Sequence, residues 1–160
     1  MTATDQTTSL RVAIDVDVPQ EHAFAVFTGQ FDRIKPREYN LLQVDIEETV
    51  FETHVGGYVY DRGVDGSVCR WARVLAFDPP ERLVISWDID SQWRLEPDPD
   101  RASEVEVRFV PVGAGQTRVE LQHRHLDRHG AGWQDYRSGL EGESGWPVFL
   151  QRFRELATRP

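Results

Sequence analysis

Two histidines in one predicted strand could bind a metal ion or transfer a proton. In the segment 117–125, His123 and His125 alternate with charged residues, and this period of two places both imidazoles on one face of a strand. Such a pair could form half of a metal site, but a third ligand would have to come from His54, His129 or a carboxylate, at spacings that no metal motif predicts. We therefore expect no metal and interpret the pair as hydrogen-bonded histidines at a cavity or a strand edge.

General acid or base catalysis is a second interpretation of the same two side chains. Imidazole titrates near neutral pH, so an inward-facing His123 or His125 could act on the carbonyl of a bound molecule. No Gly-x-Ser-x-Gly nucleophile motif is present, and Cys69 has no sequence-adjacent base to activate it. A cyclase or hydrolase stays open as an alternative, with His123 and His125 as candidate catalytic residues and no cofactor implied. The charged residues that could assist are Glu52, Arg70, Asp88 and Asp90.

Large aromatic side chains support a third interpretation, a binding pocket. Such rings combine apolar area with an occasional directed hydrogen bond, which suits a ligand cavity. The same rings also fill solid cores, and the pattern alone does not decide between the two. The set comprises Tyr58, Tyr60, Trp71, Trp87, Trp93, Trp133, Tyr136, Trp146, Phe149 and Phe153.

A helix over residues 144–156 is the element that would position these side chains. Its apolar residues recur at the i, i+3, i+4 and i+7 spacing of a single helical stripe. We expect Ser144 to cap its first free amides and Pro147 to lie in its first turn, where the missing N–H costs nothing. The apolar stripe consists of Trp146, Phe149, Leu150, Phe153 and Leu156 or Ala157.

Most of the chain before this helix has the alternating pattern of β-strands, so its packing partner is a sheet. A short helix over 20–29 follows the first strand, a short helix and a loop are expected within 30–42, and another short helix within 126–143. The clearest hairpins join 67–77 to 82–89 and 103–111 to 117–125. The expected strands are 10–18, 43–48, 50–55, a strand from 58, 67–77, 82–89, 103–111 and 117–125.

Length and charge restrict the classes of function. The 160 residues suit one domain, which we expect over 9–160 after a disordered N-terminus at 1–8. A formal net charge of -9, with Lys and Arg scattered, argues against nucleic acid and anionic membranes as partners. The single cysteine excludes an intramolecular disulfide within this sequence. We expect neither a signal peptide nor a membrane-spanning run, and we expect a soluble cytoplasmic protein.

Several local sequences together resemble one superfamily. They cover nearly the whole chain and are similar to the SRPBCC, or START-like, superfamily, more narrowly to its bacterial branch related to the activator of the heat-shock-protein ATPase. The motifs are Val55-Gly56-Gly57-Tyr58, the run 73–87 with its Asp78-Pro79-Pro80 turn, the strands 103–109 and 117–123, and Gly145-Trp146-Pro147.

The resemblance implies an α+β helix-grip fold, in which a curved antiparallel sheet of about six to seven strands wraps around the long C-terminal helix. It also implies a deep cavity between sheet and helix, used across the superfamily for apolar or aromatic small molecules and in some members for polyketide cyclisation or dehydration. The residues expected to line this cavity are Tyr58, Tyr60, Trp71, Trp87, His123, Trp146, Phe149 and Phe153.

We therefore predict a binding protein for a small hydrophobic or aromatic molecule. Two alternatives stay open: a cyclase/dehydratase-like or hydrolase-like enzyme that uses the same cavity, and a co-chaperone-like or stress-response interaction module. An edge strand could support a homodimer. We do not expect a chaperone partner, because nothing in the sequence marks a chaperone-binding surface.

Overall fold

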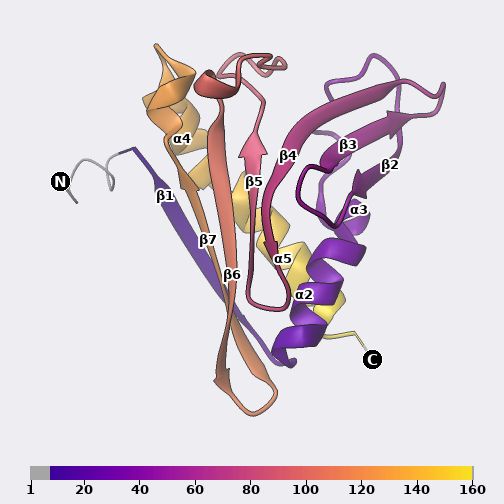
Figure 1. Ribbon diagram of the computed structural model, residues 1–160, viewed down its shortest axis with the longest axis vertical. Helices are drawn as coiled ribbons and strands as arrows, with labels where there is room; N and C mark the ends of the chain where they lie inside the picture. Colours follow the sequence, from indigo (N-terminus) through magenta and orange to yellow (C-terminus); the bar gives the residue numbers. More distant parts are fainter. Residues whose placement is uncertain (1–7, 160) are drawn as a thin grey trace.

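The computed structural model describes residues 8–159, which form a curved sheet of seven antiparallel strands grasping a long C-terminal helix (Figure 1). The spatial order is β1-β7-β6-β5-β4-β3-β2, and the predicted α+β helix-grip fold is confirmed. The strands are β1 (Leu10–Val16), β2 (Ile46–Phe51), β3 (Tyr58–Gly63), β4 (Val68–Asp78), β5 (Arg82–Trp87), β6 (Ser103–Gly113) and β7 (Gln116–Arg124). The helices are α2 (Gln20–Gly29), α3 (Phe31–Ile34), α4 (Trp133–Glu141) and α5 (Trp146–Ala157), with 3₁₀ turns η1 (Pro99–Arg101) and η2 (Leu126–His129).

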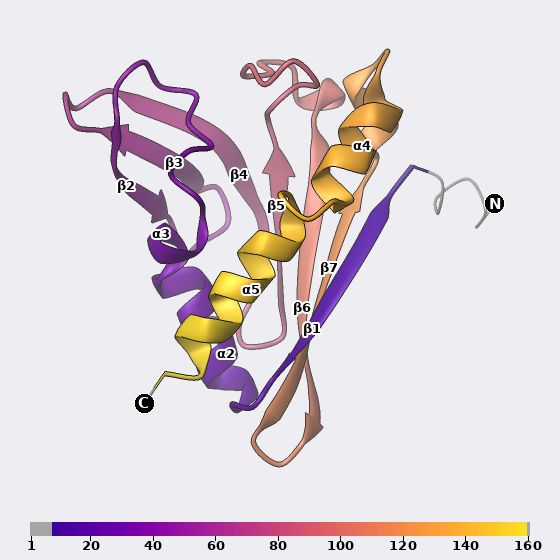
Figure 2. The same cartoon turned by 180° about the vertical axis from the view of Figure 1, so that it is seen from behind.

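Helix α5 runs diagonally across the concave face of the sheet, with α2 beside its C-terminal half (Figure 2). Strands β1 and β2 are consecutive in the chain but lie at opposite edges of the sheet, so α2 and α3 cross its open side between them. This crossing brings the segment after α3 next to the N-terminal half of α5, where the cavity described below is found.

The space between the sheet and the C-terminal half of α5 is filled by a solid core. Phe153 of α5 is completely buried, and its ring packs edge-on against Phe27 of α2 at a centroid distance of 5.5 Å and against Phe109 of β6 at 6.5 Å. The apolar stripe of α5 meets the inward-facing residues of β1, β6 and β7, as expected for an amphipathic helix on a sheet.

Both hairpins predicted from the sequence are present, as β4–β5 and β6–β7. One strand prediction is wrong: the two strands expected at 43–48 and 50–55 are a single strand, β2. Asn40 holds the residues before β2 in a turn, because its side-chain amide donates to the carbonyl of Val44 at 2.8 Å and its carbonyl accepts from the N–H of Leu42. After β2 the chain turns again, and the N–H of Tyr58 is bound by the carboxylate of Glu52 at 2.8 Å.

The start of α5 differs from the expected cap. Gly145, not Ser144, is the N-cap residue, and no side chain caps the helix, although Pro147 does lie in the first turn as predicted. The carbonyl of Ser144 instead accepts a hydrogen bond from the hydroxyl of Tyr39, which ties the segment after α3 to the start of α5.

The expectation that His123 and His125 share a strand face is also wrong. Strand β7 ends at Arg124, and His125 has a left-handed backbone with φ of 60°, which turns the chain into η2. Only His123 therefore points inward from the strand.

The part of the chain expected to be a disordered N-terminus lies, except for residue 8, outside the described residues. Among the helices of residues 8–159, none is long and apolar enough to span a membrane.

Candidate functional site

A cavity of about 370 Å³ lies at the end of the sheet–helix interface opposite the solid core. Its walls come from the end of β5 and the residues that follow it, the C-terminal part of α4, the start of α5 and the segment after α3. The volume falls within the range of roughly 300–1,000 Å³ typical of small-molecule sites. The apolar lining consists of Tyr39, Leu41, Trp87, Ile89, Trp93, Leu140, Trp146 and Phe149.

Aromatic rings form a continuous wall along one side of this cavity. Trp146 packs against Trp87 at a centroid distance of 5.2 Å and against Phe149 at 4.8 Å, and Tyr39 stacks on Phe149 at 6.4 Å. The indole N–H of Trp87 donates to the hydroxyl of Tyr136 at 2.6 Å, so this polar group is satisfied within the protein. The wall is therefore a surface of rings suited to a flat apolar or aromatic molecule.

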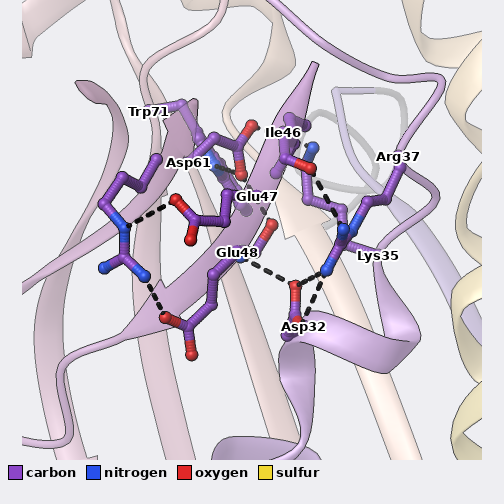
Figure 3. Close-up of polar contacts among 10 residues, drawn as sticks. Asp32, Lys35, Arg37, Ile46, Glu47, Glu48, Asp61 and Trp71 are labelled. Carbon is purple, nitrogen blue, oxygen red and sulfur yellow. Dashed lines mark hydrogen bonds and ion pairs between the residues drawn. The ribbon is translucent and has the colours of Figure 1, made fainter. Parts of the chain in front are cut away.

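Lys35 is the one cation among the residues that line the cavity, within the described part of the chain. It directly follows α3, its side chain is 6% exposed, and its ammonium donates to the carbonyl of Tyr39 at 2.6 Å and to the carboxylate of Asp61 at 3.0 Å. Asp61 is itself 1% exposed and also accepts from Thr49 at 2.7 Å and from the indole N–H of Trp71 at 3.3 Å (Figure 3). A buried charge is stable only when it is paired and hydrogen-bonded, and this pair meets that condition.

A second set of polar contacts is made by Asp32 and Arg37, which lie on either side of Lys35 in the chain. The carboxylate of Asp32 in α3 accepts from the guanidinium of Arg37 at 2.9 Å and from the backbone N–H of Thr49 in β2 at 2.8 Å. Arg37 also donates to the carbonyl of Ile46 at 3.0 Å, as Figure 3 shows. Because these bonds attach the segment on both sides of Lys35 to β2, the backbone at Lys35 has a fixed position beside the cavity.

The profile of the protein family described as "Activator of Hsp90 ATPase homolog 1-like protein" matches residues 17–158. This chain is an AHSA1-like protein. The predicted resemblance is thereby confirmed over nearly the whole sequence.

Two solved structures are similar in sequence as well as in fold. Txn09, an anthrahydroquino-γ-pyrone synthase solved in complex with SUM, is 42% identical, with 92% of this chain and 96% of that chain covered and a TM-score of 0.64. CalC from Micromonospora echinospora, a self-sacrificing resistance protein, is 27% identical, with 94% of each chain covered and a TM-score of 0.66. NE0264 from Nitrosomonas europaea, at 16% identity, 96% coverage of each chain and a TM-score of 0.66, shows the shared fold alone. No protein with a curated function matches the sequence.

Three of the eight residues predicted to line the cavity of this AHSA1-like protein do so, namely Trp87, Trp146 and Phe149. Trp71 lies behind the wall, fully buried against Trp87 at a centroid distance of 5.5 Å, and Phe153 belongs to the solid core. Tyr58 and Tyr60 lie on the outer face of the sheet, because the strand alternation turns their neighbours Val59 and Asp61 inward.

His123, the eighth predicted residue, lies behind the ring wall and does not line the cavity. Its Nδ1 accepts from the indole N–H of Trp146 at 3.1 Å, and its Nε2 is 2.7 Å from the hydroxyl oxygen of Ser103. Complete burial lowers the pKa of His123 well below its ordinary value, because the charged imidazolium would be desolvated, and the nearby His129 lowers it further by a smaller amount. His123 is thus a neutral structural link. His125 does not line the cavity either.

Metal chemistry has no visible support in the arrangement of side chains. Within residues 8–159 no three histidine, cysteine or acidic side chains are grouped so that they could hold a metal ion.

Tyr39, Ile89, Trp93 and Lys35 line the cavity but were not among the predicted site residues. The first three lie in irregular segments, where no periodicity predicts the direction of a side chain. For Lys35 a signal exists in composition: it is the only lysine in the sequence, and the other 17 of its 18 Lys and Arg residues are arginines.

Proposed function

We propose that this AHSA1-like protein binds a small polycyclic aromatic molecule, of the kind made in polyketide pathways, in the cavity at the start of α5. The observation that carries the proposal is the 370 Å³ cavity with a continuous wall of aromatic rings. The 42% identity to Txn09, an anthrahydroquino-γ-pyrone synthase, supports a fused aromatic ligand in preference to a flexible lipid chain.

The energetics of such binding come mainly from burial of apolar surface. Removing about 200 Å² of apolar ligand surface from water contributes about 5 kcal/mol, at roughly 25 cal/mol per Å². Association entropy opposes this gain, so useful affinity requires a pocket that is already formed. The hydrogen bonds around Lys35 and the bond from Tyr39 to the carbonyl of Ser144 keep the walls in place and thereby support the proposal.

Titration of the protein with hydroxyanthraquinones, flavonoids and long-chain fatty acids tests the proposal through tryptophan fluorescence. Trp87, Trp93 and Trp146 lie at the cavity, so a fused aromatic ligand is expected to quench the emission and to raise the melting temperature. Fatty acids are expected to do neither. If none of the aromatic compounds changes emission or melting, the proposal is wrong.

A blocking variant makes this test specific to the cavity. Gly139 of α4 lines the cavity, and a Cβ at this position would meet no atom within 4 Å, so Gly139→Leu introduces a bulky side chain at the cavity. Gly29→Leu is the matched control, because Gly29 also lies in a helix with open space around it but is not at the cavity. We expect binding to be lost in the first variant and kept in the second.

Catalysis in the same cavity is a second candidate function. The observations that favour it are the 42% identity to Txn09, an anthrahydroquino-γ-pyrone synthase, and the presence of Lys35 among the lining residues, whose ammonium could stabilise an enolate during ring closure. The test is product analysis after incubation with aromatic polyketides that quench the fluorescence. A product formed by the wild type and not by Gly139→Leu supports an enzyme, whereas recovery of unchanged ligand supports binding alone.

A further inference from the structure

We propose that Lys35 selects the ligand of this cavity by binding an ionisable oxygen, a phenol or enol at the edge of the aromatic ring system, and by holding it as the anion. This inference rests on the proposed function and names the chemistry that the ligand must carry. Three features of Lys35 support it: it is the only lysine of the sequence, it has an unused hydrogen-bond donor, and it lines the cavity beside the aromatic rings.

The only lysine in the sequence lies at this position. The other 17 of the 18 Lys and Arg residues are arginines. Lys35 therefore differs from them in presenting a compact ammonium charge, whereas each arginine presents a planar guanidinium. Lysine is rarely buried, yet Lys35 is 5% exposed. A protein that needed only an ion pair between α3 and β3 could place it at the surface.

The ammonium of Lys35 has one donor to spare. It carries three N–H groups, and within the described residues it has two acceptors, the carbonyl of Tyr39 and the carboxylate of Asp61. The face of Trp71 lies 5.8 Å from Nζ and offers only a ring contact. The third N–H has no acceptor among the described residues, and because Lys35 lines the cavity we infer that this N–H can reach an acceptor on a bound ligand.

The carboxylate of Asp61 accepts from Lys35 through Oδ2 and from Thr49 and Trp71 through Oδ1. The carboxylate among the lining residues is Glu38, which is 67% exposed and lies 3.7 Å from Arg152. Lys35 also interacts electrostatically with the thiol of Cys69, which is buried on β4. The cavity thus presents one buried cation to a ligand and keeps its acid at the solvent side.

A fused aromatic ligand lying against Trp146 and Phe149 would direct its edge along the wall toward the segment that carries Lys35. An oxygen anion at that edge gains charge-assisted hydrogen bonding in a poorly hydrated site. A ligand without this oxygen leaves the spare donor buried and unpaired, which penalises its binding. The geometry therefore discriminates between hydroxylated polycycles and their unsubstituted parents.

The test compares 2-hydroxyanthraquinone with 9,10-anthraquinone. The visible absorption of 2-hydroxyanthraquinone reports its ionisation directly, so a titration of the bound dye measures its pKa in the site. We expect binding to lower this pKa by about 1 or more, and we expect the hydroxylated quinone to bind about tenfold more tightly than its parent.

The double variant Lys35→Met/Asp61→Asn removes the cation without leaving a buried carboxylate unpaired. We expect it to bind both quinones equally and to lose the lowering of the dye pKa. Arg118→Met is the control, because Arg118 is partly exposed on β7, pairs with Asp15 and Glu120 and does not line the cavity. It is expected to retain the preference. If the double variant keeps both the preference and the lowered dye pKa, the inference is wrong.

A measurement on the unmodified protein does not depend on whether the variant folds. Protein labelled with ¹⁵Nζ-lysine gives one side-chain signal, because Lys35 is the only lysine in the sequence. We expect 2-hydroxyanthraquinone to shift this signal much more than 9,10-anthraquinone does. Equal shifts would overturn the assignment of Lys35 while leaving cavity binding intact. If neither quinone quenches tryptophan emission, the proposed function itself fails, and this inference fails with it.

Discussion

The indole N–H of Trp146 donates to Nδ1 of His123 across 3.1 Å, and this bond determines the tautomer of the histidine. An indole nitrogen can only donate, so Nδ1 must be unprotonated and the ring hydrogen must be on Nε2. Nε2 then donates to Ser103, whose hydroxyl is left to donate to Nε2 of His129 at 2.7 Å. A chain of neutral groups thus connects the cavity wall to η2, and it depends on both histidines remaining uncharged, each with a single ring hydrogen.

The first prediction is that stability falls when the protein is acidified below pH about 6.5. Burial lowers the pKa of both His123 and His129 in the folded protein. Below their ordinary pKa the unfolded chain takes up protons that the folded protein excludes, so the contribution is complete above this value and is lost as the pH falls. Each histidine contributes a slope of up to about 1.4 kcal/mol per pH unit.

Urea denaturation between pH 8 and pH 5 measures this slope. In His123→Gln we expect a lower free energy of unfolding at pH 8 and a shallower loss below pH about 6.5, because only one buried histidine then resists protonation. A free energy of unfolding that is constant or rises between pH 6.5 and pH 5 would contradict the neutral chain.

The second prediction separates solid core from cavity wall on the same helix. Phe153 is fully buried between α2 and β6, so Phe153→Ala creates a new void and is expected to cost about 3–5 kcal/mol of unfolding free energy. Phe149 lies one helical turn away and lines an existing cavity. Phe149→Ala should therefore cost clearly less stability and should weaken the binding of aromatic ligands.

Denaturant unfolding and fluorescence titration of the two variants provide the comparison. Equal losses of stability would mean that the cavity wall is as tightly packed as the core around Phe153. An undiminished affinity in Phe149→Ala would remove this ring from the binding site.

The third prediction concerns Cys69. Burial is the main cause that raises the pKa of this thiol to about 11. The nearby carboxylate of Asp61 adds to the rise, whereas Lys35 acts in the opposite direction. Because the thiolate is the reactive form, Cys69 should not react with Ellman's reagent at pH 8 in the folded protein and should react fully in urea. Rapid reaction without denaturant would show that β4 opens readily, which would also expose the Lys35–Asp61 pair.

The amphipathic stripe of α5 and the two long hairpins could be predicted because regular elements translate sequence spacing directly into side-chain direction. The spacing thus places Trp146 and Phe149 on the inner side of α5, and the family resemblance makes them candidate wall residues. The same rule misplaces Tyr58 and Tyr60, because the sequence does not state which face of β3 is the inner one. The inner face carries Asp61, a residue that patterning assigns to solvent, and only its contacts with Lys35, Thr49 and Trp71 explain its burial.

The cavity itself could not be located from the sequence, since its position depends on irregular segments. Tyr39 and Lys35 follow α3, and Trp93 has a left-handed backbone with φ of 60° in the segment between β5 and β6. No periodic pattern fixes such residues. His123 shows the converse: its inward direction could be predicted, but its lack of access to the cavity follows from Trp146, which covers it.

The last prediction concerns Gly145, which joins α4 to α5. A Cβ at this position would lie 2.1 Å from the carbonyl oxygen of Leu140, a backbone atom that cannot move aside without displacing the end of α4. Gly145→Ala should therefore cost at least about 2 kcal/mol of unfolding free energy. It should also shift Trp146, and with it the hydrogen bond to His123, so that tryptophan emission changes and ligand affinity falls.

Gly139→Ala is the control for stability alone, since Gly139 is a helical glycine whose added Cβ meets nothing within 4 Å, although the residue itself lines the cavity. Replacing it should raise stability by about 0.5–1 kcal/mol through helix propensity. Urea denaturation and tryptophan emission of the two variants decide the point. If Gly145→Ala is as stable as Gly139→Ala and keeps the emission of the wild type, the close approach of the two helices does not hold Trp146. In that case the glycine of the Gly145-Trp146-Pro147 motif would not be required to place the indole of Trp146 against His123 and the cavity.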